Sequence, residues 1–205
     1  AMAGRSNVGK STLINALARR PIARTSAAPG KTRLANIYRL TVEGGPRQGS
    51  GQGAAGRWGL YLVDLPGYGY ARGGGSAAEE LRLVAEAYFR SRDAGRGMRD
   101  APEIPDPAPR TSHPGMALLL IDSRHPGLES DQQAHEWLAT LGVDPLLVAT
   151  KVDKLSRTER TRNLRELERV FGKPAIAVSA ARGEGMDELW KTIASKVKTA
   201  SRADA

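Results

Sequence analysis

Short apolar runs alternate with amphipathic stretches along most of the chain. Five runs have the length and composition of β-strands, and we predict strands at residues 35–42, 58–64, 116–122, 145–150 and 174–179. The stretches between them repeat apolar residues every three or four positions, which is typical of helices with one buried face. This alternation predicts an α/β fold with a mainly parallel sheet.

Several predicted helices begin with a recognisable capping signal. In a capping box, Ser is followed three residues later by Glu or Gln, and the two side chains satisfy free backbone N–H groups. Three helix starts have this spacing: Ser76 with Glu79, Ser130 with Gln133, and Ser156 with Glu159. A last helix carries one apolar stripe that we interpret as core: Met186, Leu189, Trp190, Ile193 and Val197.

Two stretches interrupt this pattern. Residues 44–57 contain six Gly between two predicted strands, so we expect a long flexible loop that closes an antiparallel hairpin. Residues 92–114 contain five Pro and few apolar side chains, which predicts a mobile insertion that buries little surface. A chain of 205 residues otherwise predicts a single domain over residues 1–205.

Composition excludes several classes of protein. The chain has no Cys, which excludes disulfides, cysteine catalysis and cysteine-based metal sites. No apolar run approaches the roughly 18 residues of a membrane helix, so we expect no membrane span.

The net charge of +9 comes from 31 basic and 22 acidic side chains, and it is concentrated near the N-terminus. The first 40 residues hold no Asp or Glu, and the remaining 165 residues are nearly balanced. This segment favours a surface that faces a polyanion, with an ordinary solvated helix face as the alternative. Its basic residues are Arg5, Lys10, Arg19, Arg20, Arg24, Lys31, Arg33 and Arg39.

Residues 4–11 read Gly-Arg-Ser-Asn-Val-Gly-Lys-Ser, which matches the phosphate-binding pattern G-x-x-x-x-G-K-[ST]. Glycines allow a tight turn that aims backbone N–H groups at phosphate oxygens, and Lys10 adds a charge. A strand should precede such a loop, and only residues 1–3 do so, which predicts a truncated first strand. The predicted nucleotide contacts are Gly4, Arg5, Ser6, Asn7, Val8, Gly9, Lys10, Ser11 and Thr12.

Two further segments indicate a metal and a γ-phosphate. Asp64-Leu65-Pro66-Gly67 ends a predicted strand, where Asp64 can reach Mg²⁺ through water and the Gly67 N–H can meet the γ-phosphate. In Gly30-Lys31-Thr32, the Thr can coordinate Mg²⁺ when the γ-phosphate is present. We count both segments among the nucleotide contacts. We also predict Lys10, Thr32 and Gly67 as catalytic residues, and Ser11 and Thr32 as metal ligands.

A third group of residues indicates which base is bound. Thr150-Lys151-Val152-Asp153 follows an apolar strand, and Asp153 can accept two hydrogen bonds from guanine that adenine cannot donate. Val178-Ser179-Ala180 ends the last predicted strand, and a backbone N–H there can donate to the guanine O6. Each segment alone is compatible with an ordinary turn, but the ordered set predicts a guanine-nucleotide site.

These motifs resemble those of the EngB family of GTPases, also called YihA or YsxC. The likeness rests on residues 4–11, on Arg24-Thr25-Ser26 with Pro29-Gly30-Lys31-Thr32, and on Asp64-Leu65-Pro66-Gly67-Tyr68-Gly69-Tyr70-Ala71. It continues in Asp122-Ser123-Arg124-His125-Pro126, Asp131-Gln132-Gln133 and Thr150-Lys151-Val152-Asp153-Lys154. The resemblance covers nearly the whole chain apart from the two insertions, which are longer than in the family pattern. Val152 also replaces the common Ala.

The resemblance implies a three-layer P-loop fold like that of small GTPases, with Mg²⁺-dependent binding of GTP and GDP. It also implies a role in assembly of the large ribosomal subunit and in normal cell division and septation. The expected partners are the subunit precursor and rRNA, and the expected state is a cytoplasmic monomer.

Tyr68 occupies the position where many GTPases place a water-orienting Gln. A phenol cannot hold water through an amide, so we predict slow hydrolysis that the assembling ribosome, a cation, or both accelerate. Similar GTPases use a P-loop Asn to help bind K⁺, which makes Asn7 a candidate contact, with simple loop capping as the alternative. Arg33 and Arg39 follow Thr32, which suggests the hypothesis of an rRNA contact that senses the bound nucleotide.

Two other functions remain open at this point. A metabolic P-loop kinase would prefer ATP, and the segment 150–153 argues against it. A nucleotide-gated scaffold in cell division would bind GTP with little turnover. Nucleotide-dependent co-sedimentation with ribosomal particles separates this scaffold from a ribosome-assembly switch.

Overall fold

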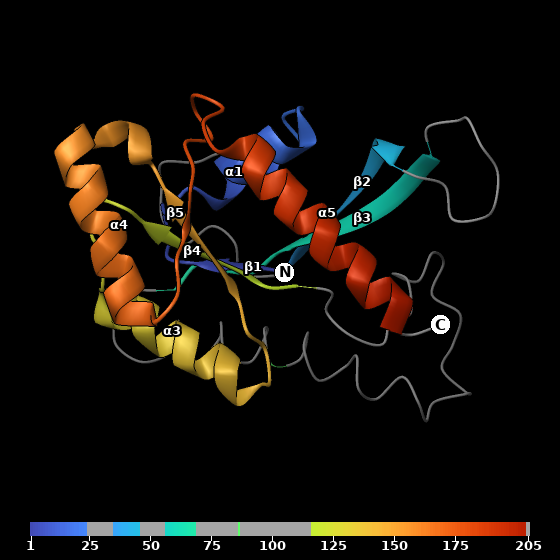
Figure 1. The fold of residues 1–205 in the computed structure, drawn as a ribbon. Helices are drawn as coiled ribbons and strands as arrows, with labels where there is room; N and C mark the ends of the chain where they lie inside the picture. Colours follow the sequence, from blue (N-terminus) through green and yellow to red (C-terminus); the bar gives the residue numbers. More distant parts are fainter. Residues whose placement is uncertain (24–34, 46–55, 69–85, 87–115, 204–205) are drawn as a thin grey trace.

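The computed structural model describes residues 1–23, 35–45, 56–68, 86 and 116–203. Within them, six strands form one sheet in the order β2-β3-β1-β4-β5-β6 (Figure 1). The pair β2–β3 is antiparallel, and the other described pairs are parallel, which confirms the predicted α/β class with one antiparallel hairpin. The strands are β1 (Met2–Gly4), β2 (Asn36–Gly45), β3 (Gly56–Asp64), β4 (Leu118–Asp122), β5 (Leu146–Thr150) and β6 (Ile176–Ala177).

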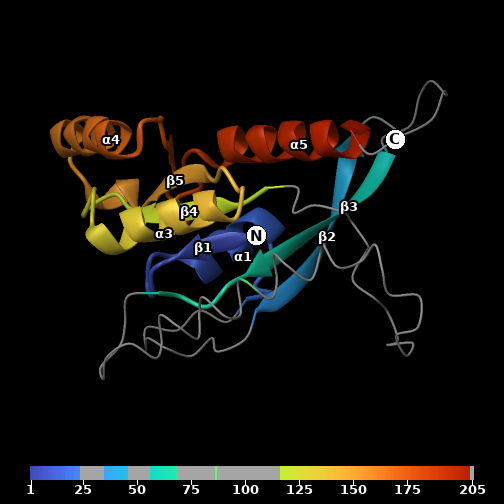
Figure 2. The ribbon, with the colours of Figure 1, turned by 90° about the horizontal axis from the view of Figure 1, so that it is seen from below.

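Helices cover both faces of this sheet. Helices α1 (Lys10–Ala18) and α5 (Met186–Ala203) pack on one face. Helices α3 (Glu129–Thr140) and α4 (Arg157–Phe171) pack on the other face. A short 3-10 helix, η2 (Val152–Lys154), follows β5. The β2–β3 ribbon lies at the edge of the molecule away from α3 and α4 (Figure 2).

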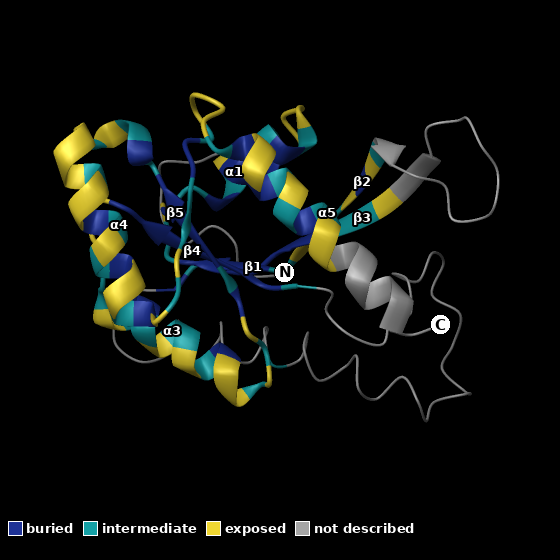
Figure 3. Ribbon diagram, viewed as in Figure 1, coloured by how far each residue is buried: buried dark blue, intermediate teal, exposed yellow. Residues whose placement is uncertain are grey.

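Alternate residues of the central strands belong to two separate hydrophobic clusters. Leu118 and Leu120 of β4 pack with α1 and α5, whereas Leu119 and Ile121 pack with α3 and α4. None of these four side chains is more than 2% exposed. Burial on both faces explains why β4 is a continuous apolar run in the sequence. Figure 3 shows this buried centre between helices whose outer faces are exposed.

Strand β1 has three residues, yet it lies in the middle of the sheet. It pairs with Leu118–Leu120 of β4 on one side and with Asp64 at the end of β3 on the other. The short first strand therefore forms, because hydrogen-bonded neighbours on both sides satisfy its backbone groups. It ends at Gly4, so the next loop starts at the edge of the sheet where β3 and β4 also end.

The predicted helix caps had different outcomes. At the start of α4, the Glu159 N–H donates to Ser156 Oγ, and the Ser156 N–H donates to the Glu159 carboxylate, so this capping box is confirmed. The prediction for Ser130 was wrong, because α3 begins at Glu129 and Ser130 already lies within its first turn. The Gln133 amide donates to the Glu129 carboxylate instead. Residues 76–79 lie outside the described residues.

Some predicted boundaries also differ from the structure. Strands β2 and β3 each include two residues from the ends of the predicted loop 44–57. The last strand is shorter than the predicted 174–179, since only Ile176–Ala177 pair with β5. Residues 46–55 and 92–114 lie outside the described residues. In the described part of the chain, no helix is both long enough and apolar enough to cross a membrane.

Candidate functional site

The loops that carry the predicted motifs meet at one edge of the sheet. Strands β1, β3, β4 and β5 are parallel to one another, so their carboxyl ends face the same way. In open α/β sheets, ligands bind in the crevice outside these strand ends. Residues 4–10, 64–68, 122–126, 150–154 and 178–180 begin at this edge, whereas residues 30–32 lie outside the described residues.

The first loop, residues 4–10, turns sharply between β1 and α1. Gly9 has a φ of 108° and Asn7 a φ of 62°, which are left-handed conformations that favour Gly and tolerate Asn. A Cβ atom at Gly4 would lie 2.9 Å from both the Leu120 carbonyl oxygen and Val8 Cγ1. The loop therefore folds tightly against β4 and reaches α1 with its backbone N–H groups near the helix N-terminus, an arrangement suited to anions.

Lys10, at the start of α1, is buried under this loop and points back along it. Its Nζ donates to the carbonyl oxygens of Gly4 at 2.9 Å and Arg5 at 3.4 Å. Burial lowers the pKa of Lys10, and the nearby Asp64 carboxylate opposes this effect. The ammonium group is thus held at the loop by neutral acceptors that a phosphate oxygen can replace.

Asp64, the last residue of β3, is buried beside Lys10 and is 3% exposed. Burial raises the pKa of this carboxyl group, and the charge of Lys10 lowers it. Its Oδ1 atom has no hydrogen-bond partner among the described residues. A buried carboxylate oxygen without a donor is costly, and a hydrated divalent cation would satisfy it.

These features fit Mg²⁺, which prefers oxygen ligands and keeps several waters when it binds with substrate phosphates. Ser11 follows Lys10 in the first turn of α1, so this residue lies at the same sheet edge as Asp64. The described residues contain no cluster of three or more His, Asp or Glu that could enclose a metal alone. The described donors therefore fit a magnesium ion that also takes phosphate oxygens and water as ligands.

The segment after Asp64 packs directly against the first loop. The Ser6 N–H donates to the Tyr68 carbonyl oxygen at 3.0 Å, and Ser6 Oγ donates to the Gly67 carbonyl oxygen at 3.4 Å. A Cβ atom at Gly67 would lie 2.9 Å from the Ser6 backbone. The structure thus brings Gly67 beside the predicted phosphate loop and leaves no room there for a side chain.

Asp153 and Ser179, two of the residues predicted to select guanine, are in contact. Ser179 Oγ donates to Asp153 Oδ1 at 2.7 Å, and this hydrogen bond lowers the pKa of Asp153. The Val152 N–H also donates to the Val178 carbonyl oxygen at 3.3 Å. The carboxylate is therefore held charged and oriented next to the segment 178–180.

Thr150 and Lys151 tie this second region to the first loop. Thr150 Oγ1 donates to the Val8 carbonyl oxygen at 2.8 Å, a contact that spans 142 residues of sequence. Lys151 Nζ donates to the Asn7 carbonyl oxygen and, at 2.9 Å, to the Asp122 carboxylate. The two predicted motifs are thus parts of one hydrogen-bonded unit.

Asp122, at the end of β4, is a member of this unit; the sequence analysis named it in the family likeness but gave it no role at the site. Burial would raise its pKa, but hydrogen bonds from Arg124 and then Lys151 hold the pKa at about 2. Its ionised carboxylate fixes the Lys151 ammonium against the first loop. An acidic residue directly after an apolar strand is the sequence signal it shares with Asp64, and that signal could have identified it.

Tyr68 turns away from the loops and into the core. Its hydroxyl group donates at 2.9 Å to Oδ1 of Asp131, which lies in α3 and is 0% exposed. Burial raises the pKa of Asp131 to about 6, although the Tyr68 hydrogen bond and the charge of Arg5 oppose this shift. Sequence reasoning established only that Tyr68 is not a Gln, and it did not identify Asp131 as its partner.

One sheet edge therefore holds three features: the loop 4–10 at the N-terminus of α1, the buried pair of Lys10 and Asp64, and the hydrogen-bonded pair of Asp153 and Ser179. The family model described as "50S ribosome-binding GTPase" matches residues 1–179, and the protein is a GTPase that binds GTP and GDP. "Probable GTP-binding protein EngB" of Symbiobacterium thermophilum is 37% identical over 221 residues, covering 97% of this chain and 87% of the relative. The chain belongs to the EngB family.

Other comparisons agree with this assignment. "Probable GTP-binding protein EngB" of Pelotomaculum thermopropionicum is 35% identical over 199 residues, covering 94% of this chain and 82% of the relative. A crystal structure of a probable GTP-binding protein engB superposes with a TM-score of 0.57 at 20% identity, covering 97% of both chains. The structural likeness at this identity concerns the fold, and it confirms the expected P-loop GTPase architecture.

Proposed function

We propose that this chain is a guanine-nucleotide switch that holds GTP with Mg²⁺ at the shared sheet edge and acts in assembly of the large ribosomal subunit. The observation that carries the nucleotide site is the buried Asp64 carboxylate beside Lys10, with Oδ1 unpartnered. A nearby ammonium and a carboxylate that needs a donor or cation fit a phosphate with its magnesium. The ribosomal role is supported by the match to a family described as 50S ribosome-binding.

In this proposal, the first loop holds the phosphates. Backbone N–H groups of residues 4–12 donate to phosphate oxygens, and Lys10 exchanges the Gly4 carbonyl oxygen for an outer phosphate oxygen. The Gly67 N–H donates to the γ-phosphate. Gly30, Lys31 and Thr32 complete the phosphate contacts as predicted from their motif. Mg²⁺, held by Ser11, by Thr32 and through water by Asp64, would neutralise charge on the β- and γ-phosphates.

The base is selected by Asp153 and by the backbone of residues 178–180. An ionised Asp153 accepts the two hydrogen bonds that guanine donates, while adenine would leave it unpaired. The Ser179 hydroxyl group orients this carboxylate. Competition with ATP tests the assignment: we expect GTP and GDP to displace a labelled guanine nucleotide and ATP not to displace it. Equal displacement by ATP would refute it.

We infer that intrinsic hydrolysis is slow, on the order of 10⁻⁴ to 10⁻² per second as in unassisted GTPases. The support is that the Tyr68 hydroxyl is committed to Asp131 in the core and so cannot orient a water at the γ-phosphate. Asn7 is exposed on the first loop, and we propose its amide as part of a K⁺ site. Equal hydrolysis rates in KCl and NaCl would exclude this K⁺ role.

The partner in this proposal is the precursor of the large ribosomal subunit with its rRNA, in the cytoplasm, and normal cell division and septation would depend on that step. Co-sedimentation with large-subunit particles tests the idea. We expect the protein to pellet with the particles in a non-hydrolysable GTP analogue and to remain in the supernatant in GDP. Absence of nucleotide-dependent pelleting would refute the switch and favour a division scaffold with little turnover.

A further inference from the structure

The outer side of α4 forms an open groove that none of the predicted nucleotide-contacting residues lines. Its volume is about 910 Å³, and it continues onto the segment after β4. The charged side chains that line it are Arg124, Arg157, Arg162, Arg165, Arg169 and Glu166. With five arginines and one glutamate in its lining, the groove attracts negatively charged ligands.

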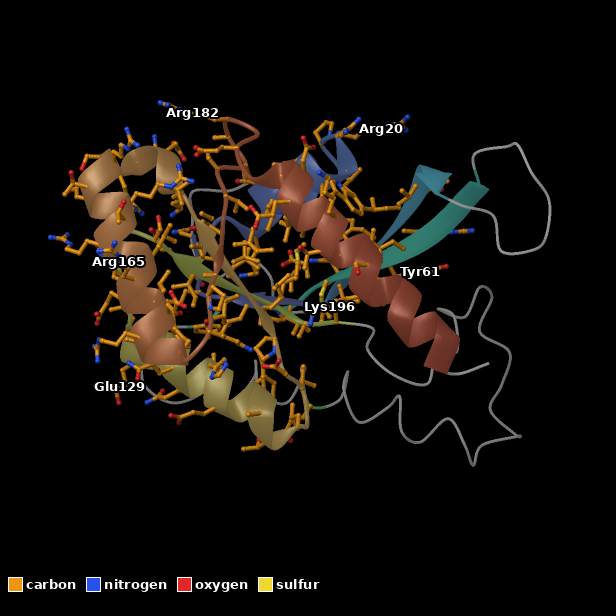
Figure 4. All side chains as sticks on the ribbon, viewed as in Figure 1. Arg20, Tyr61, Glu129, Arg165, Arg182 and Lys196 are labelled. Carbon is orange, nitrogen blue, oxygen red and sulfur yellow. The ribbon has the colours of Figure 1, made fainter. Side chains whose placement is uncertain are left out.

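The arginines follow the helical repeat of α4. Arg162, Arg165 and Arg169 are three and four residues apart, so they lie on one face of the helix, and all three are exposed. Figure 4 shows Arg165 on the outer side of α4, pointing away from the molecule. Like charges at this spacing repel one another and destabilise a helix slightly.

Carboxylates compensate only part of this charge. Arg169 pairs with Glu166, and Arg124 pairs with Asp122. Among the described residues, no carboxylate forms an ion pair with Arg157, Arg162 or Arg165. By contrast, Arg160 points toward Glu184 and pairs with it. The groove therefore retains guanidinium groups without a carboxylate partner, although Arg162 Nε donates to Asn163 Oδ1 at 3.2 Å. The same helix pairs Arg160 with Glu184.

We propose that this groove binds the phosphate backbone of RNA. The choice of RNA as the polyanion rests on the proposed ribosomal function. Guanidinium groups bind phosphates through paired N–H donors, and Thr158 adds a hydroxyl group to the lining, whereas the Thr161 hydroxyl group donates to the Arg157 carbonyl oxygen. The stripe from Arg162 to Arg169 spans about 10 Å of helix axis, which is long enough to contact several phosphates of a duplex.

Other anionic partners fit the groove less well. A membrane surface requires large apolar side chains beside the basic ones, and the lining of this groove contains none. An acidic protein would be expected to meet aromatic or aliphatic anchors at the centre of the interface. The lack of an aromatic side chain in the lining also argues against stacking of bases, so the contact recognises the backbone rather than the sequence.

The groove is attached to the nucleotide site. Asn163, on the buried side of α4, donates from Nδ2 to the Ser123 carbonyl oxygen at 2.8 Å. Arg124 donates to the Asp122 carboxylate, which in turn accepts from Lys151. A phosphate that bound Arg124 would therefore compete with a carboxylate in direct contact with the nucleotide-binding loops.

The test measures binding of a short fluorescent RNA duplex by anisotropy at several KCl concentrations. The groove variant is R162Q/R165Q, and the matched control is K191Q/K196Q, which removes the same charge from exposed positions of α5. We expect the groove variant to bind at least about tenfold more weakly at low salt and its salt slope to fall by about 1.5 to 2. The control variant should resemble the unmodified protein.

Further arms make the result decisive. R162K/R165K keeps the charge and should recover most of the lost affinity, and unchanged GTP affinity should show that each variant is folded. Equal RNA affinity in the groove and control variants would overturn the proposal. A larger loss of RNA affinity in R19Q/R20Q than in the groove variant would also overturn it. So would a groove variant that binds polyglutamate or anionic vesicles more weakly but binds RNA as well as the unmodified protein does.

The proposed function has a separate readout. If the groove variant still pellets with large-subunit particles in the GTP state as well as the unmodified protein does, the groove proposal fails and the switch stands. If the unmodified protein does not pellet with particles, the switch fails, and the RNA duplex measurement still decides whether the groove binds RNA.

Discussion

Asp131 is the most deeply buried carboxylate among the described residues, and its protonation affects stability. Its pKa is raised from an ordinary 3.8 to about 6, so the folded state favours the neutral acid. This contribution is fully present below about pH 4 and is lost as the pH rises through about 6. The unmodified protein therefore loses stability relative to D131N as the pH rises. We predict that this difference in the free energy of unfolding changes by about 2–3 kcal/mol, in favour of D131N, from about pH 4 to above pH 6. Urea unfolding at several pH values measures this difference.

Asp144 provides a contrast of opposite sign. A hydrogen bond from Lys173 lowers the pKa of Asp144, so this exposed carboxylate contributes stability above the ordinary pKa that is lost on acidification. The relative stability of D144N should therefore fall, by a small amount, as the pH rises. If D131N and D144N showed the same pH trend, the assignment of a raised pKa to Asp131 would be wrong.

A second prediction for a single residue concerns Gly67, whose packing leaves no room for a Cβ atom. G67A would place that atom 2.9 Å from the Ser6 backbone, and the two loops would have to separate. We expect a loss of about 1–3 kcal/mol of stability together with at least a tenfold loss of GTP affinity. Thermal unfolding and nucleotide titration measure the two effects.

G59A is the matched control, since a Cβ atom at Gly59 in β3 meets nothing within 4 Å. It should retain GTP affinity and most of the stability. If G59A and G67A lost GTP affinity equally, the close approach of residues 67 and 6 would not be the cause.

The contacts that sequence reasoning missed cross long distances along the chain. Residues 4–11, 64–67 and 150–153 stood out in the sequence because phosphate and guanine chemistry requires those residue types at those spacings, and the structure brings these segments to one sheet edge. The Tyr68–Asp131 and Lys151–Asp122 contacts span 63 and 29 residues. No local pattern encodes which buried hydroxyl or ammonium meets which carboxylate, because the packing of α3 and the end of β4 decides it.

At the scale of elements, Ser156 and Ser130 give a direct comparison, because both had the same capping spacing in the sequence. Ser156 caps α4, whereas Ser130 lies inside the first turn of α3. S156A should lower the free energy of unfolding by about 1 kcal/mol, and S130A should change it by less than about 0.5 kcal/mol. Urea unfolding compares them, and equal losses would show that the cap is not the source of the difference.

These two serines also show where element prediction stops. The apolar periodicity located α3, α4 and most strands, because burial on one face imposes the repeat. It could not place the start of α3, since that depends on how the loop after β4 enters the helix. Composition also could not show that residues Met2–Gly4 form a central strand, because this strand is stabilised by pairing with β3 and β4 on either side.

At the scale of the whole molecule, one ligand should stabilise the entire domain, because the loops that we propose hold it start from β1, β3, β5 and β6. Binding at 100 times Kd adds about 2.7 kcal/mol, which corresponds to a Tm increase of about 5–10 °C for a chain of this size. We predict this increase with a non-hydrolysable GTP analogue and Mg²⁺, a smaller one in EDTA, and none with the ATP analogue. In D64N, the difference between Mg²⁺ and EDTA should largely disappear, while the ligand-free Tm should not fall, because burial disfavours the Asp64 charge. A full magnesium-dependent increase in D64N would contradict the role of Asp64 in the site.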